Sequence, residues 1–269
     1  MNMIDRPSAG PLPNTTLGPG HGWAVPLAAL AVALAAWAAL FFAEIAAAVA
    51  VWDSSTAYNH CWLILPIAAW LGWQRRARLA AFLPRPAPWV ALLVLPPLGF
   101  GWLLAERLGV MEGRQLAALA IAIAMTVAIL GLRFARAMAA PLGYLVFLVP
   151  FGAFTVPALQ RVTTRIIEVL LGFTGIPHYV DDIVIEIPAG TFLVAEACAG
   201  LRFLIASIAF GALYALVMFR SPGRRLAVMA LSVVVPILAN GLRGFGLVML
   251  GHYSGSAAAV DADHVLYGW

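Results

Sequence analysis

Four residues of this chain have side chains that are suited to acyl transfer: Cys198, Arg202, Arg243 and His264. A cysteine thiolate can attack an amide carbonyl, a cation can stabilise the resulting oxyanion, and an imidazole can carry the proton to the leaving amine. Cys198 is one of only two cysteines, and it stands just before the uncharged, mostly apolar run 203–219. The simplest alternative is that Cys198 is a small buried apolar residue.

The heptapeptide from Glu196 to Arg202 contains the first two of these groups. If a helix starts near Ala197, Cys198 and Arg202 are four residues apart and share one helical face. Positive charge and helix N-terminal amides both favour the thiolate, whereas Glu196 opposes it. The segment therefore predicts a thiol whose ionisation is assisted from one side of a helix.

Arg243 lies about seven residues before Leu250, the predicted outer end of the last span. An arginine at that depth costs up to roughly 2.5–3.5 kcal/mol, so it is expected to pair, to hydrogen-bond or to line a cavity. Asn240 is three residues away on the same face, and glycines at 241, 244 and 246 allow another backbone to approach closely. The alternative is that Arg243 extends its side chain to the outer headgroups.

The composition defines the class of protein. Of 269 residues, 63% are hydrophobic and only 10% are charged, which is too little charge to cover a soluble globule. The formal charge of +4 does not indicate nucleic-acid binding, because all 16 basic residues are arginines and no basic patch with interleaved aromatic side chains accompanies them. We therefore predict an all-α polytopic membrane protein whose partner surface is the lipid bilayer and that binds no nucleic acid.

About seven transmembrane helices are expected, together with a Pro- and Gly-rich cytoplasmic leader at 1–23 and a single catalytic transmembrane domain at 24–269. The predicted spans are 24–51, 60–73, 89–105, 116–132, 141–159, 199–219 and 226–250, of which the second is short. Arginines gather in the alternate loops 75–85, 133–136 and 220–225, and these loops are therefore assigned to the cytoplasm with the N-terminus. Glu44 falls inside the first span and should face other helices or a polar cavity, in a neutral form.

The segment 160–197 is predicted to lie outside the bilayer, on the side opposite the arginine-rich loops. Residues 161–172 have apolar positions at Val162, Ile166, Val169 and Leu170, which indicates a helix on the membrane surface. The β-branched runs 183–187 and 191–195 flank a Pro-Ala-Gly sequence and predict a β-hairpin. This hairpin would bring Cys198 from the outside to the mouth of the sixth span.

Three ordered motifs resemble the signature motifs of the exosortases. They are Glu196-Ala-Cys-Ala-Gly-Leu-Arg202, then Asn240-Gly-Leu-Arg243, then His264-Val-Leu-Tyr-Gly-Trp269. The stretch Tyr58-Asn-His60-Cys61-Trp62 is also similar to the N-terminal part of these proteins, and the exosortase A subfamily is the most similar. The resemblance extends from about residue 55 to the end of the chain.

This resemblance implies a bacterial inner-membrane cysteine protease and transpeptidase of the exosortase/archaeosortase type, with its active site on the periplasmic side. It would act on membrane-anchored proteins with a C-terminal sorting signal, namely a Pro-Glu-Pro motif, a transmembrane helix and a basic tail. It would cleave them through a thioester in cells that export exopolysaccharide. By the same resemblance Cys198 is the nucleophile, Arg243 the oxyanion or thiolate partner, and His264 the general acid and base.

Supporting roles fall to four more residues, which are Arg202, Asn240, His60 and Glu196. No metal ion and no organic cofactor is implied. Two features differ from the family pattern. Ala199 stands where many members have serine, and members of the family usually continue after the histidine motif into a further, eighth span.

Two other classes of function remain open from the sequence. A transporter or binding protein could use Glu44, Arg202 and Arg243 to line a substrate path. A redox or metal site could use Cys61, Cys198, His60 and His264, although no recognised ligand spacing supports one. A Cys61–Cys198 disulfide would block the nucleophile in an oxidising compartment.

Overall fold

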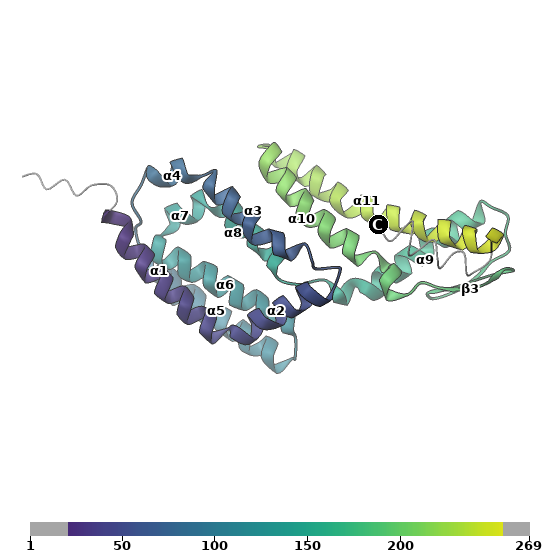
Figure 1. Ribbon diagram of the computed structural model, residues 1–269, viewed down its shortest axis with the longest axis horizontal. Coiled ribbons are helices and arrows are strands. Elements are labelled where there is room, and N and C mark those ends of the chain that lie inside the picture. Colours follow the sequence, from purple (N-terminus) through teal and green to yellow (C-terminus); the bar gives the residue numbers. More distant parts are fainter. Residues whose placement is uncertain (1–20, 255–269) are drawn as a thin grey trace, which may run out of the picture.

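The computed structural model describes residues 21–254. The predicted leader falls mostly outside the described residues, and the tail with His264 falls wholly outside them. Within the described part, five helices are long and apolar enough to cross a membrane, or six if one bent helix pair counts as a span. The predicted all-α polytopic class is therefore confirmed, with one small sheet added to the helices (Figure 1).

The predicted first span is divided in the structure. Helix α1 (His21–Leu40) and helix α2 (Phe42–Ser54) meet at Phe41. This break places Glu44 in the first turn of α2, where a negative charge complements the helix dipole. Glu44 is only 3% exposed, and its Oε1 accepts hydrogen bonds from Arg114 Nη2 at 2.7 Å and from Trp102 Nε1 at 2.9 Å. Glu44 does face other helices as predicted, but it is an ion-pair partner rather than a neutral acid.

The helices that follow are of two kinds, namely long apolar helices and short helices that connect them. They are α3 (Cys61–Trp73), α4 (Arg76–Ala80), α5 (Pro88–Arg107), α6 (Met111–Leu130), α7 (Leu132–Ala137) and α8 (Ala139–Tyr144). The arginine-bearing segments α4 and α7 lie at the same end of the molecule as the turn between α10 and α11 (Figure 1). This placement agrees with the alternation of arginine-rich loops in the sequence.

The predicted span 141–159 is wrong as a continuous helix. The chain runs from α8 through a 3-10 turn, η1 (Leu145–Leu148), and then stops being helical until η2 (Ala153–Thr155) and α9 (Val156–Gly172). The two halves are bent by 67°. Pro150 has no backbone N–H to donate, and Gly152 has a positive φ of 125°, so the helix cannot continue through this segment. The external helix consequently begins at Val156 rather than at residue 161.

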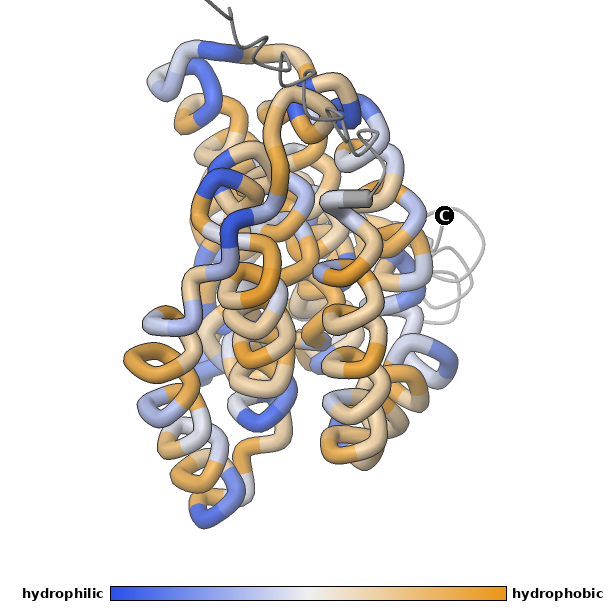
Figure 2. The backbone as a smooth tube through the Cα atoms, turned by 90° about the vertical axis from the view of Figure 1, so that its left-hand side faces the viewer, coloured by the Kyte–Doolittle hydropathy of each residue, from blue (hydrophilic) through white to orange (hydrophobic). Residues whose placement is uncertain are grey.

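Helices α10 (Leu201–Met218) and α11 (Pro222–Ser254) form the antiparallel pair at the C-terminal end of the described chain. With 33 residues, α11 is about 50 Å long, whereas about 20 residues are enough to cross a bilayer. Its C-terminal part extends beyond α10 and runs beside α9 (Figure 1). Figure 2 shows that hydrophobic residues predominate along most of the helical turns of the molecule.

We call α9, the sheet, η3 (Glu196–Ala199) and residues 240–254 of α11 the outer unit. Its sheet is antiparallel with the order β1 (Tyr179–Asp181), β2 (Val184–Ile187) and β3 (Gly190–Leu193). The predicted hairpin is therefore present as β2 and β3, and β1 adds a third strand that was not expected. The strands, α9 and α11 share an apolar core of buried residues: Ile167, Leu171, Ile185, Ile187, Val194 and Val248.

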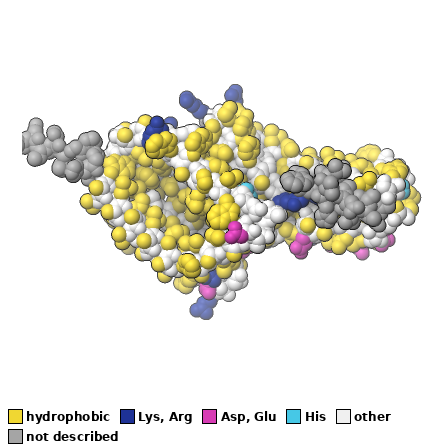
Figure 3. Space-filling view, viewed as in Figure 1, with side chains coloured by type: hydrophobic (Ala, Val, Ile, Leu, Met, Phe, Trp, Pro, Cys, Tyr) yellow, Lys and Arg dark blue, Asp and Glu magenta, His cyan; other side chains and the backbone are white. Residues whose placement is uncertain are grey.

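The surface separates hydrophobic from charged side chains. Figure 3 shows hydrophobic side chains over much of the helical body, with arginines gathered at its edge. Large side chains such as Leu92 and Phe100 on α5 are 73% and 67% exposed, which is the expected state of residues that face lipid. The chain is thus a multi-pass membrane protein with an outer unit attached to its last helix.

The ion pair between Glu44 and Arg114 yields a prediction about stability. We expect Glu44→Gln to lower the free energy of unfolding by about 2 kcal/mol, because Arg114 and Trp102 lose a charged acceptor in a buried place. The midpoint of thermal unfolding in detergent should fall by about 5 °C. Glu168→Gln is the matched control, since Glu168 pairs with Arg165 at the exposed surface and should shift the midpoint very little. Equal shifts in the two variants would contradict this assignment.

Candidate active site

Cys198 lies in the short 3-10 turn η3 and not in the helix that follows it. Gly200 has the left-handed conformation with φ 81°, and α10 begins only at Leu201. The prediction that Cys198 and Arg202 share one helical face is therefore wrong, because Gly200 ends the turn between them. Cys198 is half-buried against the core of the outer unit, while Glu196 and Ala197 are exposed beside it.

Asn240 holds the Cys198 turn from the side of α11. Its Nδ2 donates to the carbonyl oxygen of Cys198 at 2.8 Å and to Thr163 Oγ1 at 3.0 Å. Asn240 is 4% exposed, so both bonds form away from bulk water. Its Oδ1 is also buried and has no hydrogen-bond partner among the described residues. The predicted supporting role of Asn240 thus has a concrete form, which is to fix the backbone of the cysteine turn.

A second support comes from α9, and the sequence analysis missed it. Gln160 Nε2 donates to the carbonyl oxygen of Val194 at 2.8 Å, just before the turn. Gln160, Thr163 and Thr164 are buried on the face of α9 that packs inward, whereas Val162 and Val169 are 43% and 48% exposed. The predicted apolar face at Val162 and Val169 is thus turned away from the protein, as expected of a helix on the membrane surface, but the buried polar face was not expected. The signal that was available is the group of polar residues at 160, 163 and 164, which a buried hydrogen-bonding face requires.

Helices α9 and α11 approach each other at two glycines of the last span. A side-chain carbon added at Gly241 would lie 2.5 Å from Ile166 Cγ2, and one at Gly244 would lie 2.8 Å from Ile167 Cδ1. The expected close approach of another segment is confirmed at Gly241 and Gly244, where side chains of α9 occupy the space that a Cβ would need. It brings Thr163 within hydrogen-bonding distance of Asn240 and so completes the support of the cysteine turn.

Two guanidinium groups contact the aromatic ring of Phe203, at the start of α10. The guanidinium carbon of Arg202 is 4.9 Å from the centre of the Phe203 ring, and that of Arg243 is 6.0 Å from it. These distances are typical of cation–π contacts. Arg243 is also one helical turn from Asn240, which bonds the Cys198 carbonyl. The structure therefore brings Arg202, Arg243 and Asn240 together around the cysteine turn.

The remaining predicted residues are placed differently. His60 lies in the turn before α3, beside the buried cluster of Trp52, Tyr58 and Cys61, which reaches α10 at Ile205. Its Nε2 is buried and has no hydrogen-bond partner among the described residues. His264 lies outside the described residues.

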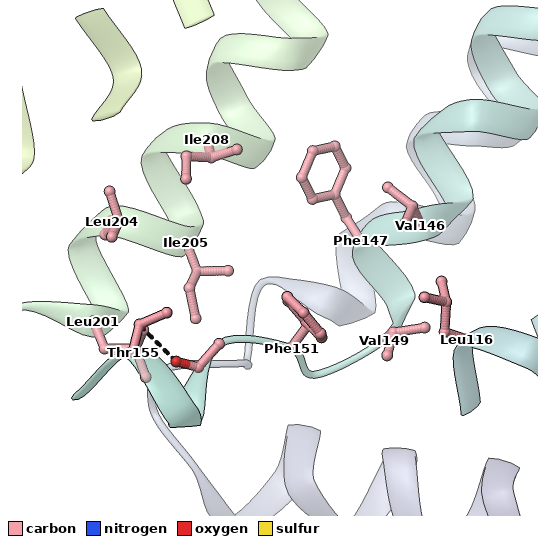
Figure 4. Close-up of a pocket in the computed structure, with 11 residues that line it drawn as sticks. Leu116, Val146, Phe147, Val149, Phe151, Thr155, Leu201, Leu204, Ile205 and Ile208 are labelled. Atoms are coloured by element: carbon pink, nitrogen blue, oxygen red, sulfur yellow. Dashed lines mark hydrogen bonds between the residues drawn. The ribbon is translucent and has the colours of Figure 1, made fainter. Parts of the chain in front are cut away.

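A hydrophobic cavity of about 370 Å³ begins beside the cysteine turn (Figure 4). One wall is a single face of α10, formed by Leu201, Leu204, Ile205 and Ile208. The opposite wall is the interrupted span, including Phe147, Val149 and Phe151. Figure 4 shows these side chains facing one another across the space. The break at Pro150 and Gly152 thus opens an apolar cavity within one helical turn of Gly200.

The structure also bears on the other chemistries that the sequence left open. Cys61 is 1% exposed and its Sγ contacts the Phe147 carbonyl oxygen at 3.3 Å, and it forms no disulfide with Cys198. Within residues 21–254, no group of three or more His, Cys, Asp or Glu side chains is placed to hold a metal ion. Glu44 pairs with Arg114 rather than facing Arg202 and Arg243, which weakens the transport interpretation.

Comparison with known proteins gives one match. The profile of the family described as "Transmembrane exosortase" matches residues 52–269. No curated protein and no solved structure matches the chain. The matched range includes the cysteine turn, both arginines and the segment that contains His264.

Gly200 provides a test of how the cysteine turn is held. We expect Gly200→Ala to destabilise the protein and to change the rate at which Cys198 reacts with a maleimide, because the new methyl group would lie 2.6 Å from Asn240 Cγ. Asn240 would have to move away from the Cys198 carbonyl. The measurements are the thermal midpoint and the labelling rate, with Cys61 serving as the unreactive buried thiol.

Gly175→Ala is the matched control for this variant. Gly175 also has a positive φ, 73°, but no atom lies within 4 Å of its added carbon. Both variants lose roughly 1 kcal/mol to the left-handed backbone, so the difference between them isolates the contact with Asn240. If the two variants behave alike, Asn240 does not control the cysteine turn.

Proposed function

The chain belongs to the transmembrane exosortase family, and from this premise we propose that Cys198 is the nucleophile of a membrane cysteine transpeptidase. Family membership gives the chain a general role in protein sorting and transpeptidation at a membrane. The finer proposal is that it cleaves C-terminal sorting signals composed of a Pro-Glu-Pro motif, a transmembrane helix and a basic tail. The proposed location is the bacterial inner membrane, with the reaction at the periplasmic face and a link to exopolysaccharide export.

The proposed reaction has two acyl-transfer steps. The Cys198 thiolate attacks the scissile carbonyl carbon, the C–N bond breaks, and the amine leaves with a proton from His264. Water or an amine then gives a proton to His264 and attacks the thioester, and the thiolate departs. Arg243 stabilises the negative charge on the carbonyl oxygen in both steps. No metal ion or organic cofactor takes part in these steps.

The observation that carries this proposal is the position of Cys198 in a rigidly held, half-buried turn at the edge of the membrane helices. The Asn240 bond at 2.8 Å and the Gln160 bond at 2.8 Å restrain the backbone on both sides of the turn. A nucleophile that must meet a carbonyl at about 3–3.5 Å benefits from such restraint.

The apolar cavity next to Leu201 supports the proposed class of substrate. A protein with its own transmembrane helix diffuses in the plane of the bilayer and presents apolar side chains at the depth of this cavity. The cavity walls are formed by residues of α10 and of the interrupted span, and they offer hydrophobic contact. The scissile bond would then lie just outside the bilayer, level with the cysteine turn.

Cleavage of an anchored reporter tests the proposal. A periplasmic reporter protein that ends in Pro-Glu-Pro, an apolar helix and an arginine-rich tail should be shortened when it is produced with this chain. We expect Cys198→Ala to abolish the shortening, and Arg243→Ala and His264→Ala to reduce it at least 100-fold. Gel mobility and mass spectrometry of the reporter measure the result.

Cys61→Ala is the matched control, because it removes the other cysteine from a buried position away from the turn. It should retain most of the cleavage. Equal cleavage by the wild type and by Cys198→Ala would refute the assignment of the nucleophile.

A further inference from the structure

Arg202 differs from other partly buried arginines that the structure describes, such as Arg114. Arg114 forms ion pairs with both Glu44 and Glu106. The ion pairs among residues 21–254 involve Arg114 and Arg165 and do not include Arg202. Arg202 Nε is also buried without a hydrogen-bond partner in that part of the chain. Arg202 therefore lies next to the cysteine turn with a buried Nε–H that has no acceptor among the described residues.

An unsatisfied N–H in such a place is costly. A buried donor without an acceptor has lost its hydrogen bonds to water without replacement, and the cost is larger when the group is charged. The contact of Arg202 with the Phe203 ring at 4.9 Å orients the guanidinium but supplies no hydrogen bond. Arg243, near the same ring, adds a second positive charge. An anion at this position would give the buried Nε–H of Arg202 an acceptor.

The N-terminus of α10 adds to the positive electrostatic potential around Arg202. Arg202 is the second residue of this helix, and its N-cap is Gly200, which offers no side-chain oxygen to the first amides. The N-terminal end of a helix has a partial positive charge and favours anions. Arginine is also the residue that best binds a carboxylate, because its planar group donates two parallel hydrogen bonds. The chemistry around Arg202 thus fits a carboxylate.

We propose that Arg202 is a specificity-determining residue that binds an acidic side chain of the substrate beside the scissile bond. The inference rests on the proposed function, and in that setting the acid is the glutamate of the Pro-Glu-Pro motif. It differs from a supporting role for Arg202 toward the Cys198 thiolate, because the guanidinium acts on the substrate rather than on the enzyme's sulfur.

The distance along the chain limits where the acid can lie. Cys198 and Arg202 are four residues apart, so their Cα atoms are at most about 14 Å apart. The Gly200 turn and the bond from Asn240 to the Cys198 carbonyl shorten this path. An extended peptide advances about 3.3 Å per residue. The acidic side chain therefore lies within a few residues of the carbonyl that Cys198 attacks.

A matrix of reporters and variants tests this inference. The reporters contain Pro-Glu-Pro, Pro-Gln-Pro or Pro-Lys-Pro before the same helix and tail. The wild type should cleave the Glu reporter at least ten times faster than the Gln reporter. Arg202→Gln should remove that preference by slowing the Glu reporter at least tenfold while changing the Gln reporter less than threefold. Arg202→Glu should cleave the Lys reporter faster than the Glu reporter.

Arg161→Glu is the matched control. Arg161 is an exposed arginine of α9 in the same outer unit, so its reversal changes the net charge equally without touching the turn. It should leave the order of the three reporters unchanged. If it reverses the order as Arg202→Glu does, the preference comes from the general field of the outer unit and the inference is overturned.

Binding to the Cys198→Ala protein separates this inference from the proposed reaction. That variant, with and without Arg202→Gln, is purified in detergent and its affinity for the Glu and Gln reporters is measured. Arg202-dependent preference for Glu supports the inference even if the wild type cleaves no reporter, in which case only the proposed function fails. If Arg202→Gln slows cleavage of both reporters by the same factor and leaves binding unchanged, Arg202 acts on the thiolate and the inference is refuted.

Discussion

The hydrogen bond from Asn240 Nδ2 to the Cys198 carbonyl is the contact on which the arrangement of the site depends. It joins two segments that are 42 residues apart, and it does so inside a nearly dry interface. Three other features must be present for it to form. Gly200 must have no side chain, Thr163 must accept the second Nδ2 hydrogen, and α9 must approach α11 at Gly241. The last span is thus a scaffold for the cysteine turn as well as a membrane anchor.

The outer unit shows how a small sheet can serve a membrane enzyme. Its strands alternate between inward Ile185 and Ile187 and outward Glu186, and the inward side chains share a core with α9 and α11. This core rigidifies the connection between Val194 and Cys198. The strands therefore fix the position and direction of the cysteine turn before the start of α10, which a flexible loop of similar length would not do. Restraint of this kind suits the role proposed for Cys198 as a nucleophile.

Much of the fold could be predicted from the sequence, because apolar length and arginine distribution are strong signals in membrane proteins. The breaks could not be placed by hydropathy alone. Pro150 and Gly152 interrupt a run that is apolar throughout, and Glu44 is buried next to Phe41 only because Arg114 and Trp102 come from helices far along the chain. The inward face of α9 could not be placed for a related reason. The apolar spacing indicates only the membrane-facing side with Val162 and Val169, whereas the inward side is set by the buried hydrogen bonds of Gln160 and Thr163.

Two partly buried arginines, Arg114 and Arg202, illustrate how structural and functional charges differ. Arg114 is neutralised by carboxylates of the same chain, so its energy contributes to folding. Arg202 has a cation–π contact and an unsatisfied donor, so the chain bears a cost there that folding does not require. An unsatisfied donor of this kind is retained in a protein when a ligand supplies the missing acceptor during function. A carboxylate brought by an anchored peptide would arrive beside Cys198 already at high local concentration, since the bilayer confines both partners to one plane. Recognition of the acid and positioning of the scissile carbonyl then become parts of a single binding event.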